Sequence, residues 1–257
     1  MAQIRLPDGN LKETCKICGA ASPLFDVVDF SKSCQELESK FFARSGIPIY
    51  YNFCPNCGFL FTRAFDSWTN EDFLDTIYNS DYSLVDPDFS DTRPIANAKL
   101  VIRMLNKADK SLSILDFGGG NGRFRDAMRE GGFENTYSYD PYQAESHWPH
   151  ATYDLITAFE VIEHAVSPME TLRTMSSLLK PQGIVLFSTL LQPKEIHSIR
   201  LNWWYVAPRN GHISLFSAVA LEHAWQKIGY NVRKSKGHLM MAWQDFPSFA
   251  HDWMMPN

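Results

Sequence analysis

Short apolar runs in the second half of the chain alternate with segments of helical periodicity. Each run is bounded by glycine, proline or polar residues, which predicts a buried strand. The predicted strands cover 113–117, 136–139, 155–159 and 183–190. The predicted helices cover 94–105, 123–130, 167–180 and 217–228. Segments 230–234 and 238–243 predict a closing hairpin. This alternation predicts a doubly wound, Rossmann-like α/β sheet over about 100–245.

Residues at two helix starts and in one polar segment refine this pattern. Ser167 begins a Ser-Pro-Met-Glu motif, which predicts a capping box with proline at the first helical position. Further upstream, Thr69 opens a short predicted helix that runs to about Tyr78. Residues 79–93 are polar, rich in aspartate and interrupted by a proline, so they predict a loop.

Four of the five cysteines form two Cys-x-x-Cys-Gly motifs, Cys15/Cys18 and Cys54/Cys57, with 35 residues between them. Two thiolates on one tight turn point at the same ion, and the glycine lets backbone N–H groups face the sulfurs. Two such turns predict a closed four-cysteine site that suits a structural Zn²⁺ ion. A redox pair or unligated buried thiols are the alternatives. We interpret Cys34 as a small packed side chain.

Tyr50, Tyr51, Phe53 and residues 59–61 flank the second cysteine motif and predict a short strand pair that holds it. The sequence therefore predicts a zinc-binding module over 1–65, a helical lead-in with an active-site loop over 66–110, and the α/β core over 111–257. A segment at 191–217 interrupts the core and holds several aromatic residues.

The composition excludes several classes of protein. Of 257 residues, 14% are aromatic, which excludes intrinsic disorder. Lys and Arg number 24 against 29 Asp and Glu, and a net charge of −5 disfavours a nucleic-acid partner. No apolar run reaches the roughly 18 residues of a membrane helix, and the first residues lack the apolar core of a signal peptide. We therefore expect a cytoplasmic protein with neither a membrane nor a nucleic-acid partner.

A glycine cluster, ILDFGGGNGRF, joins the first predicted strand of the core to the next helix. A glycine-rich turn of this kind lets a ligand approach the backbone and the helix N-terminus. A phosphate loop needs Lys-Ser/Thr after the last glycine, and a dinucleotide fold needs glycine at the position that Arg123 occupies. The spacing is instead D-x-G-x-G-x-G from Asp116 to Gly122. A packed turn without a ligand remains the alternative.

This spacing resembles the S-adenosylmethionine (AdoMet) loop of class I methyltransferases. Two further features support the resemblance: Asp140 ends the next strand, where a carboxylate accepts both ribose hydroxyls, and FEVIEHAVSPMETL follows the third apolar run. The resemblance implies an AdoMet-dependent methyltransferase. The cofactor-binding residues that it implies are Asp116, Phe117, Gly118, Gly119, Gly120, Asn121, Gly122, Asp140, Pro141, Phe159 and Glu160.

One interval departs from the class I pattern. Residues 141–153 are too few for the helix, strand and adenine-contacting loop that most members place there. We expect Trp148 or His150 to flank the adenine ring, and burial of a loop residue explains each equally well.

The segment at 191–217 is where class I cores build the acceptor site. It ends in Gly-His-Ile-Ser-Leu-Phe-Ser, residues 211–217, which is similar to a segment of zinc-containing sugar C-methyltransferases. The resemblance implies that His212 is a base, that His164 reaches the site, and that Tyr78 or Tyr82 contacts the acceptor. We add Trp204, Tyr205 and Asn210 as substrate-binding candidates.

Two departures from that narrower family affect the expected chemistry. Its glutamate is Gly211 here, which removes a carboxylate partner of the base, and its C-terminal domain has no counterpart before Asn257. A histidine base near its ordinary pKa predicts a rate that falls below neutral pH. We therefore expect methyl transfer to a small polar metabolite: a sugar, a nucleotide-linked sugar or a phosphorylated precursor. The alternatives are a zinc-containing methyltransferase acting on RNA or protein, and a non-catalytic AdoMet-binding protein.

Overall fold

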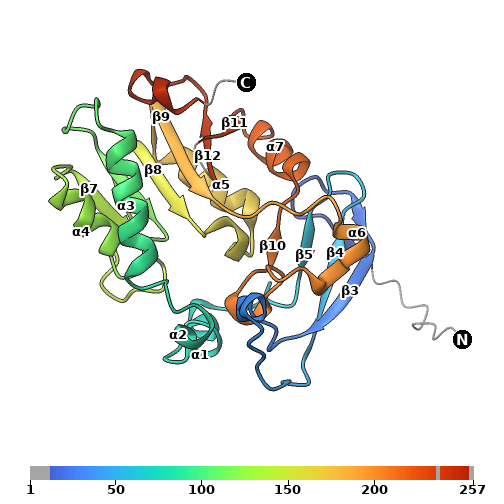
Figure 1. Cartoon of the computed structure of the whole chain (residues 1–257). Helices are drawn as coiled ribbons and strands as arrows, with labels where there is room; N and C mark the ends of the chain where they lie inside the picture. Colours follow the sequence, from blue (N-terminus) through green and yellow to red (C-terminus); the bar gives the residue numbers. More distant parts are fainter. Residues whose placement is uncertain (1–11, 236–237, 255–257) are drawn as a thin grey trace, which may run out of the picture.

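A six-stranded sheet forms the centre of the computed structural model, which describes residues 12–235 and 238–254 (Figure 1). The strand order is β11–β12–β9–β8–β6–β7. Strands β6 to β9 pair in parallel, and β12 and β11 add to the β9 edge as an antiparallel hairpin. The predicted doubly wound sheet and closing hairpin are confirmed. Their bounds are β6 Ile114–Phe117, β7 Thr136–Tyr139, β8 Tyr153–Phe159, β9 Leu179–Ser188, β11 Asn231–Lys234 and β12 Leu239–Trp243.

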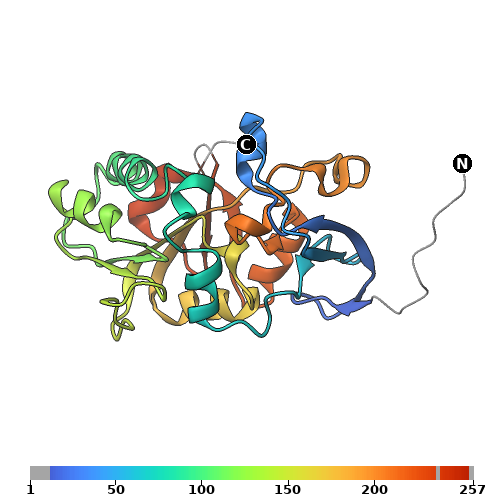
Figure 2. The ribbon, with the colours of Figure 1, turned by 90° about the horizontal axis from the view of Figure 1, so that it is seen from below.

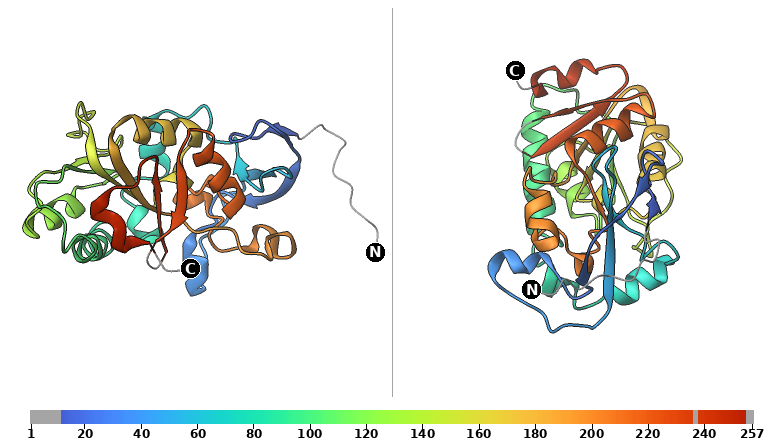
Figure 3. Two further views of the ribbon diagram at one scale, coloured as in Figure 1. Left: turned by 90° about the horizontal axis from the view of Figure 1, so that it is seen from above. Right: turned by 90° about the vertical axis from the view of Figure 1, so that its right-hand side faces the viewer.

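Helices cover both faces of this sheet, because its inner parallel strands β6, β8 and β9 are largely buried on both sides. On one face α3 (Thr92–Met104) and α4 (Arg123–Glu130) pack with the C-terminal 3₁₀ helix η5 (Ser248–Trp253). On the other face lie α5 (Pro168–Ser177) and α7 (Ala218–Gln226), as the right-hand view of Figure 3 shows. The first cysteine motif packs into the core beneath α7.

The start of α5 differs from the prediction. Ser167 makes no side-chain hydrogen bond to the helix, because its ψ of 77° departs from the extended conformation. Ser217 has ψ 164°, and its hydroxyl accepts a hydrogen bond from the backbone N–H of Ala220 at the start of α7. Helix α5 also ends earlier than predicted, because β9 already begins at Leu179, which pairs with Tyr153.

The segment before α3 holds more structure than predicted. Helix α1 (Asn70–Thr76) begins with the capping box of Thr69 and Asp72, which confirms the predicted helix. The predicted loop at 79–93 is wrong in part, since α2 (Tyr82–Val85) forms a turn of helix whose first and last side chains are buried. Figure 2 shows this α1–α2 segment between the central sheet and the blue N-terminal strands.

A second, antiparallel sheet has the order β10–β5–β4–β3. Its strands are β3 Leu24–Asp29, β4 Pro48–Phe53, β5 Leu60–Thr62 and β10 Ser214–Leu215. The pairing of β4 with β5 confirms the predicted strand pair at the second cysteine motif. Strand β10 comes from the 191–217 segment, so a late part of the chain completes the N-terminal sheet.

Short elements complete the described chain. The hairpin of β1 (Glu13–Thr14) and β2 (Ala21–Ser22) carries the first cysteine motif. The others are η1 Cys34–Glu38, η2 Ile162–His164, α6 Ile196–Ile199, η3 Arg200–Asn202 and η4 Pro208–Asn210. Across residues 12–235 and 238–254, no helix combines the length and apolar character needed to cross a membrane.

Candidate active site

A cavity of about 980 Å³ opens at the carboxyl ends of the parallel strands. The last residues of these strands line it: Phe117, Tyr139, Phe159 and Ser188. From β6 the chain adds β7 on one side and then crosses over to add β8 on the other side, while all three strands stay parallel. Open α/β sheets bind ligands at such a switch point. Residues of α2, η4 and the 191–217 segment line the opposite wall, so one cavity joins the glycine loop to the predicted acceptor residues.

The glycine loop packs tightly on a buried carboxyl group. The Asp116 side chain accepts a hydrogen bond of 2.8 Å from the Thr157 hydroxyl, and its burial raises its pKa to about 7. The N–H groups of Gly118 and Gly119 donate to the Tyr139 carbonyl at 2.8 and 3.1 Å. These bonds hold the loop across the ends of β6 and β7.

Gly119→Ala is expected to destabilise this loop. An added Cβ collides with the Asp116 carboxylate and the Ser138 hydroxyl, and overpacking of this kind costs about 1–3 kcal/mol. We expect the thermal midpoint to fall by about 2–10 °C, measured by circular dichroism. Gly120→Ala is the control, because its Cβ meets nothing within 4 Å and only its φ of +53° carries a cost. An equal or larger fall for Gly120→Ala contradicts the contact argument.

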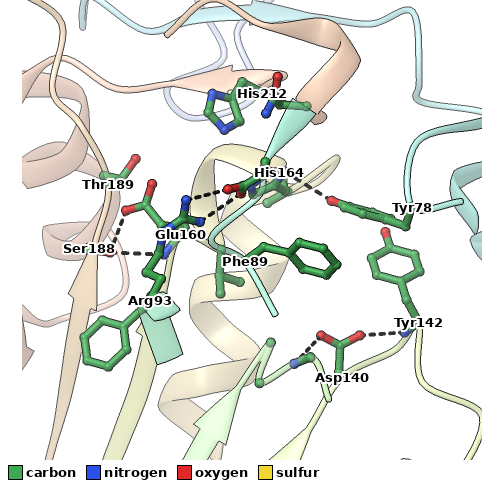
Figure 4. A pocket seen from close by; sticks show the side chains of 18 of the residues that line it. Tyr78, Phe89, Arg93, Asp140, Tyr142, Glu160, His164, Ser188, Thr189 and His212 are labelled. Carbon is green, nitrogen blue, oxygen red and sulfur yellow. Dashed lines mark hydrogen bonds and ion pairs between the residues drawn. The ribbon is translucent and has the colours of Figure 1, made fainter. Parts of the chain in front are cut away.

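Asp140 sits at the end of β7 and binds two backbone segments. Its Oδ2 accepts the N–H of Gly120 at 2.9 Å, and its Oδ1 accepts the N–H of Tyr142 at 2.8 Å (Figure 4). Each carboxylate oxygen keeps a second lone pair, so two hydroxyl donors of a ligand can still bind. Burial raises the pKa of Asp140, and these backbone donors oppose that shift.

The structure brings most of the predicted cofactor residues to the cavity wall. Those that line it are Asp116, Phe117, Gly118, Gly119, Gly120, Asp140, Pro141, Phe159 and Glu160. Asn121 and Gly122 lie outside the lining: the Asn121 amide donates to the Ser90 carbonyl, and Gly122 is the left-handed residue before α4. The sequence prediction missed other lining residues, among them Tyr142, Ser188 and Thr189. They lie just after β7 or at the end of β9, so their positions at strand ends could have identified them.

Residues 141–152 form neither helix nor strand. The sequence predicted only that this interval is too short for a helix, a strand and a loop together. Trp148 lines the cavity with 46% of its surface exposed, and its ring meets the edge of Tyr139 at 5.1 Å. His150 is not part of the lining. Trp148 is therefore the better placed of the two predicted adenine neighbours.

Two predicted histidines meet at the opposite wall, with ring centroids 4.9 Å apart. The Nδ1 atom of His164 lies 3.2 Å from the hydroxyl of Tyr78 (Figure 4). The Nδ1 atom of His212 lies 2.9 Å from the Tyr205 carbonyl, which only accepts, so Nδ1 carries the proton and Nε2 keeps a free lone pair. For a neutral ring, this contact selects the tautomer of His212 with the proton on Nδ1.

Burial changes the expected pH behaviour of these histidines. It lowers the pKa of His212 below the ordinary histidine value and lowers the pKa of His164 well below it. The sequence predicted that the rate falls just below neutral pH, and the lowered pKa of His212 moves this expected fall to lower pH. A buried base of lowered pKa stays neutral, and so competent, at pH values where an exposed histidine is already protonated.

The structure also gives a steric reason for glycine at position 211. Its φ is +86°, and an added Cβ would lie 3.0 Å from Nδ1 of His164 and 3.3 Å from the Tyr78 hydroxyl. A side chain here would push into the contact between these two residues. A carboxyl group nearby is that of Glu163, one oxygen of which lies within 4.8 Å of a ring nitrogen of His164 and of His212.

The five predicted substrate-binding residues Tyr78, Tyr82, Trp204, Tyr205 and Asn210 all line the cavity. Asn210 is engaged within the protein, because its amide donates to the Val85 carbonyl and accepts the N–H of Cys34. The rings of Tyr78 and Tyr82 pack edge to face with centroids 5.1 Å apart. The sequence missed Arg93 and Asp86, which form a two-point ion pair at 2.6 and 2.9 Å in the same wall.

The four cysteines of the two motifs converge as predicted. Sγ atoms of Cys15 and Cys57 lie 3.7 Å apart, those of Cys18 and Cys54 lie 3.4 Å apart, and all four fall within 4.8 Å of one another. A tetrahedral Zn²⁺ ion with Zn–S bonds of about 2.3 Å requires sulfurs about 3.8 Å apart. The donor set and its spacing therefore fit zinc.

Known proteins resemble this chain in sequence and in fold. A family model described as a methyltransferase domain matches residues 89–235. Ubiquinone biosynthesis O-methyltransferase of Vibrio campbellii is 36% identical over 61 residues, which are 24% of this chain and 26% of that protein. The protein of the same name from Vibrio parahaemolyticus is 46% identical over 39 residues, 15% and 17% of the two chains. The match thus spans about a quarter or less of these relatives.

One solved structure shows the same fold. It is the 1,6-didemethyltoxoflavin-N1-methyltransferase of Burkholderia thailandensis, with bound S-adenosylhomocysteine, at 13% identity and a TM-score of 0.50. The similarity covers 79% of this chain and 98% of that one. The chain belongs to the methyltransferase domain family, whose model covers more than half of it.

Proposed function

We propose that the protein transfers the methyl group of AdoMet to a small polar acceptor, a sugar or a nucleotide-linked or phosphorylated sugar-like metabolite. The observation that carries this proposal is one continuous cavity with the glycine loop and Asp140 at one end and His164 and His212 at the other. Methyl transfer is a displacement at an already electrophilic sulfonium carbon. Alignment of the two ligands about 3 Å apart therefore supplies much of the catalysis.

The cofactor end suits AdoMet in its charge and its hydrogen-bonding groups. In this proposal Asp140 accepts the ribose hydroxyls, the loop at 118–120 lies against the methionine portion, and Trp148 flanks the adenine. AdoMet supplies the electrophilic methyl group, and the chain's own residues orient it and keep water away. His212, with a free Nε2, takes a proton from the acceptor as the methyl group moves.

The charges at the acceptor end of the cavity favour an acceptor whose group next to the methyl is neutral or cationic. Arg93 is the one Lys or Arg among the described lining residues, and Asp86 already binds it at two points. A phosphate beside the methyl would find no unpaired cation there, so the nucleotide or phosphate portion lies toward the cavity mouth in this proposal. The resemblance of 211–217 to sugar C-methyltransferases and the O-methyltransferase relatives support a carbon or hydroxyl acceptor.

We propose that Cys15, Cys18, Cys54 and Cys57 hold a structural Zn²⁺ ion. All four thiolates are used, so the ion has no open position for a substrate. The second cysteine turn contacts the start of α7, where the Ser217 hydroxyl donates to the Cys57 carbonyl at 2.9 Å. In this proposal the second cysteine turn therefore supports the core where the 191–217 segment meets α7.

Asp140→Ala tests the cofactor end of this proposal. We expect AdoMet binding to weaken by about 1.5–3 kcal/mol, the range for a hydrogen bond to a charged group, which is about 10- to 150-fold in Kd. Isothermal titration with AdoMet and with S-adenosylhomocysteine measures the change. The wild-type protein is expected to bind both and not NAD.

The matched control is Asp126→Ala, a half-exposed carboxylate on α4 that pairs with its neighbour Arg125. It is expected to leave AdoMet affinity unchanged. Because Asp140 also holds the N–H groups of Gly120 and Tyr142, the thermal midpoints of both variants are measured with the affinities. A folded Asp140→Ala protein that binds AdoMet as tightly as wild type excludes the ribose role.

A further inference from the structure

Two acidic side chains share one phenol next to the histidines. The hydroxyl of Tyr205 lies 3.1 Å from Oε2 of Glu160 and still closer to Oε1 of Glu163. Glu160 lines the cavity, and its Oε1 accepts a hydrogen bond of 2.7 Å from the Ser188 hydroxyl. Glu163 lies behind it with 0% of its surface exposed.

The number of protons at this contact is too small if both acids are ionised. A phenol has one proton to donate, and a carboxylate only accepts. The Tyr205 hydroxyl can donate to only one of the two carboxyl groups, so the other carboxyl group must carry a proton and donate it to the Tyr205 oxygen. Glu163 is the acid that fits, because its Oε2 is buried without a hydrogen-bond partner, a costly state for a charged oxygen. Burial, and next the charge of Glu160, raise the pKa of Glu163 well above its ordinary value.

Glu163 and Tyr205 also support the position of His212. The Tyr205 carbonyl accepts the Nδ1–H of His212, and the two rings pack with centroids 4.2 Å apart. The Glu163 carbonyl accepts the N–H of Ile213 at 2.9 Å. Together these contacts place a buried carboxyl group within 4.8 Å of a ring nitrogen of each histidine.

We propose that Glu163 is a positioning residue that carries a proton while His212 is neutral, and that Glu163, Tyr205 and Glu160 form a relay that moves a negative charge toward His212 when this histidine becomes protonated. This inference rests on the proposed base role of His212 and goes beyond it, since it assigns the group that compensates the imidazolium.

The relay step conserves its atoms and its charge. The O–H bond of Glu163 breaks as one forms on the Tyr205 oxygen, and the original Tyr205 O–H bond breaks as one forms on Oε2 of Glu160. One proton thus moves from Glu163 to Glu160, and one negative charge moves from the cavity wall to the carboxyl group beside His212. An opposite charge at this range favours the imidazolium.

Titratable and charged groups from several elements face His212. Cys34 of η1 lies 3.7 Å from Nδ1, and Tyr51 of β4 donates its hydroxyl to the His212 carbonyl. Burial raises the pKa of both groups far above neutral, so neither changes its charge near pH 7. The other groups that face His212 are Asp86, Arg93, Glu160, Glu163, His164 and Tyr205.

Infrared spectroscopy at pH 7, with ¹³C-labelled glutamate, tests the protonated state directly. The label separates glutamate from Asp116, whose pKa of about 7 gives a second protonated carboxyl group. We expect a carbonyl band of a protonated glutamic acid in the wild-type protein, its retention in Glu222→Gln, and its loss in Glu163→Gln. Glu222 is the control because it is exposed on α7. A spectrum without the band, or a band that persists in Glu163→Gln, overturns the proposal.

Nuclear magnetic resonance of ¹⁵N-labelled histidine tests the relay. The His212 signals, assigned with His212→Asn, are expected to titrate at lower pH in Glu163→Gln and in Tyr205→Phe than in wild type, and unchanged in Glu222→Gln. Glutamine keeps a donor toward Tyr205, and phenylalanine keeps the ring packing, so a merely structural role predicts no shift. If Glu163→Gln fails to fold, Tyr205→Phe alone decides the result. An unchanged His212 titration in Tyr205→Phe refutes the relay.

These measurements need neither AdoMet nor an acceptor, so their failure is distinct from failure of the proposed methyl transfer. One further outcome also overturns the inference. If wild-type protein contains a second metal ion per chain that Glu163→Gln loses and Glu222→Gln keeps, the cation beside Glu163 is a metal and not a proton.

Discussion

Serine at both Cys15 and Cys18 is expected to abolish zinc binding and to unfold the N-terminal sheet. Purified wild-type protein should contain about one zinc ion per chain by elemental analysis, and the double variant about none. Metal binding and folding are coupled in such sites, with about 10–16 kcal/mol of apparent binding energy for structural zinc in small modules. The variant should therefore also lose cooperative thermal unfolding of the whole chain.

Cys34→Ser is the matched control for the zinc prediction. Cys34 is the fifth cysteine and lies outside the four-sulfur cluster, beside His212. It is expected to keep a full zinc content. Full zinc content in the Cys15/Cys18 double variant would show that these motifs do not hold the ion.

Replacement of His212 by alanine is expected to lower turnover by about 10²–10⁴-fold, the usual contribution of a general base. AdoMet affinity should stay nearly unchanged, because His212 lies at the acceptor end of the cavity. The measurement is turnover with an acceptor found by a mass-shift screen against sugar nucleotides and phosphorylated sugars. His223→Ala, an exposed histidine on α7, is the control and should keep wild-type turnover.

The pH dependence has a defined sign. In the proposed role His212 acts only when neutral, and burial lowers its pKa, so the rate should hold through neutral pH and fall only below the ordinary histidine range of about 6.5. A decline that begins above pH 7 would assign the ionisation to another group. A His212→Ala enzyme with normal turnover but weaker acceptor binding would identify His212 as a binding residue.

The sequence was most informative where local pattern and fold agree. The glycine loop, Asp140 and the four strands of the parallel sheet follow from apolar periodicity and from residues at strand ends, and the structure places them together. The cysteine motifs were equally direct, because two pairs of like ligands at the same spacing have few alternative explanations. The roles of single residues in the cavity remain predictions.

The contacts that escaped prediction join residues distant in sequence. Tyr205 reaches Glu160 and Glu163 across more than 40 residues, and no periodicity marks such a pairing. Helix α2 was missed because the segment around it is rich in aspartate and contains a proline, whereas the helix itself buries Tyr82 and Val85 in a cluster of residues distant in sequence. The Ser167 cap failed for a similar reason, since tertiary context sets its ψ angle.

The pairing of strand β10 with β5 delays completion of the N-terminal sheet until late in the synthesis of the chain. Strands β3 to β5 leave the ribosome about 150 residues before Ser214 and Leu215 can pair with Leu60 and Phe61. Until then, β5 exposes a strand edge whose backbone groups can pair with another chain. A fragment that stops after the cysteine module keeps this open edge permanently, which makes it prone to aggregation. The cysteine module is therefore continuous in sequence, but its sheet is completed only when the 191–217 segment adds strand β10.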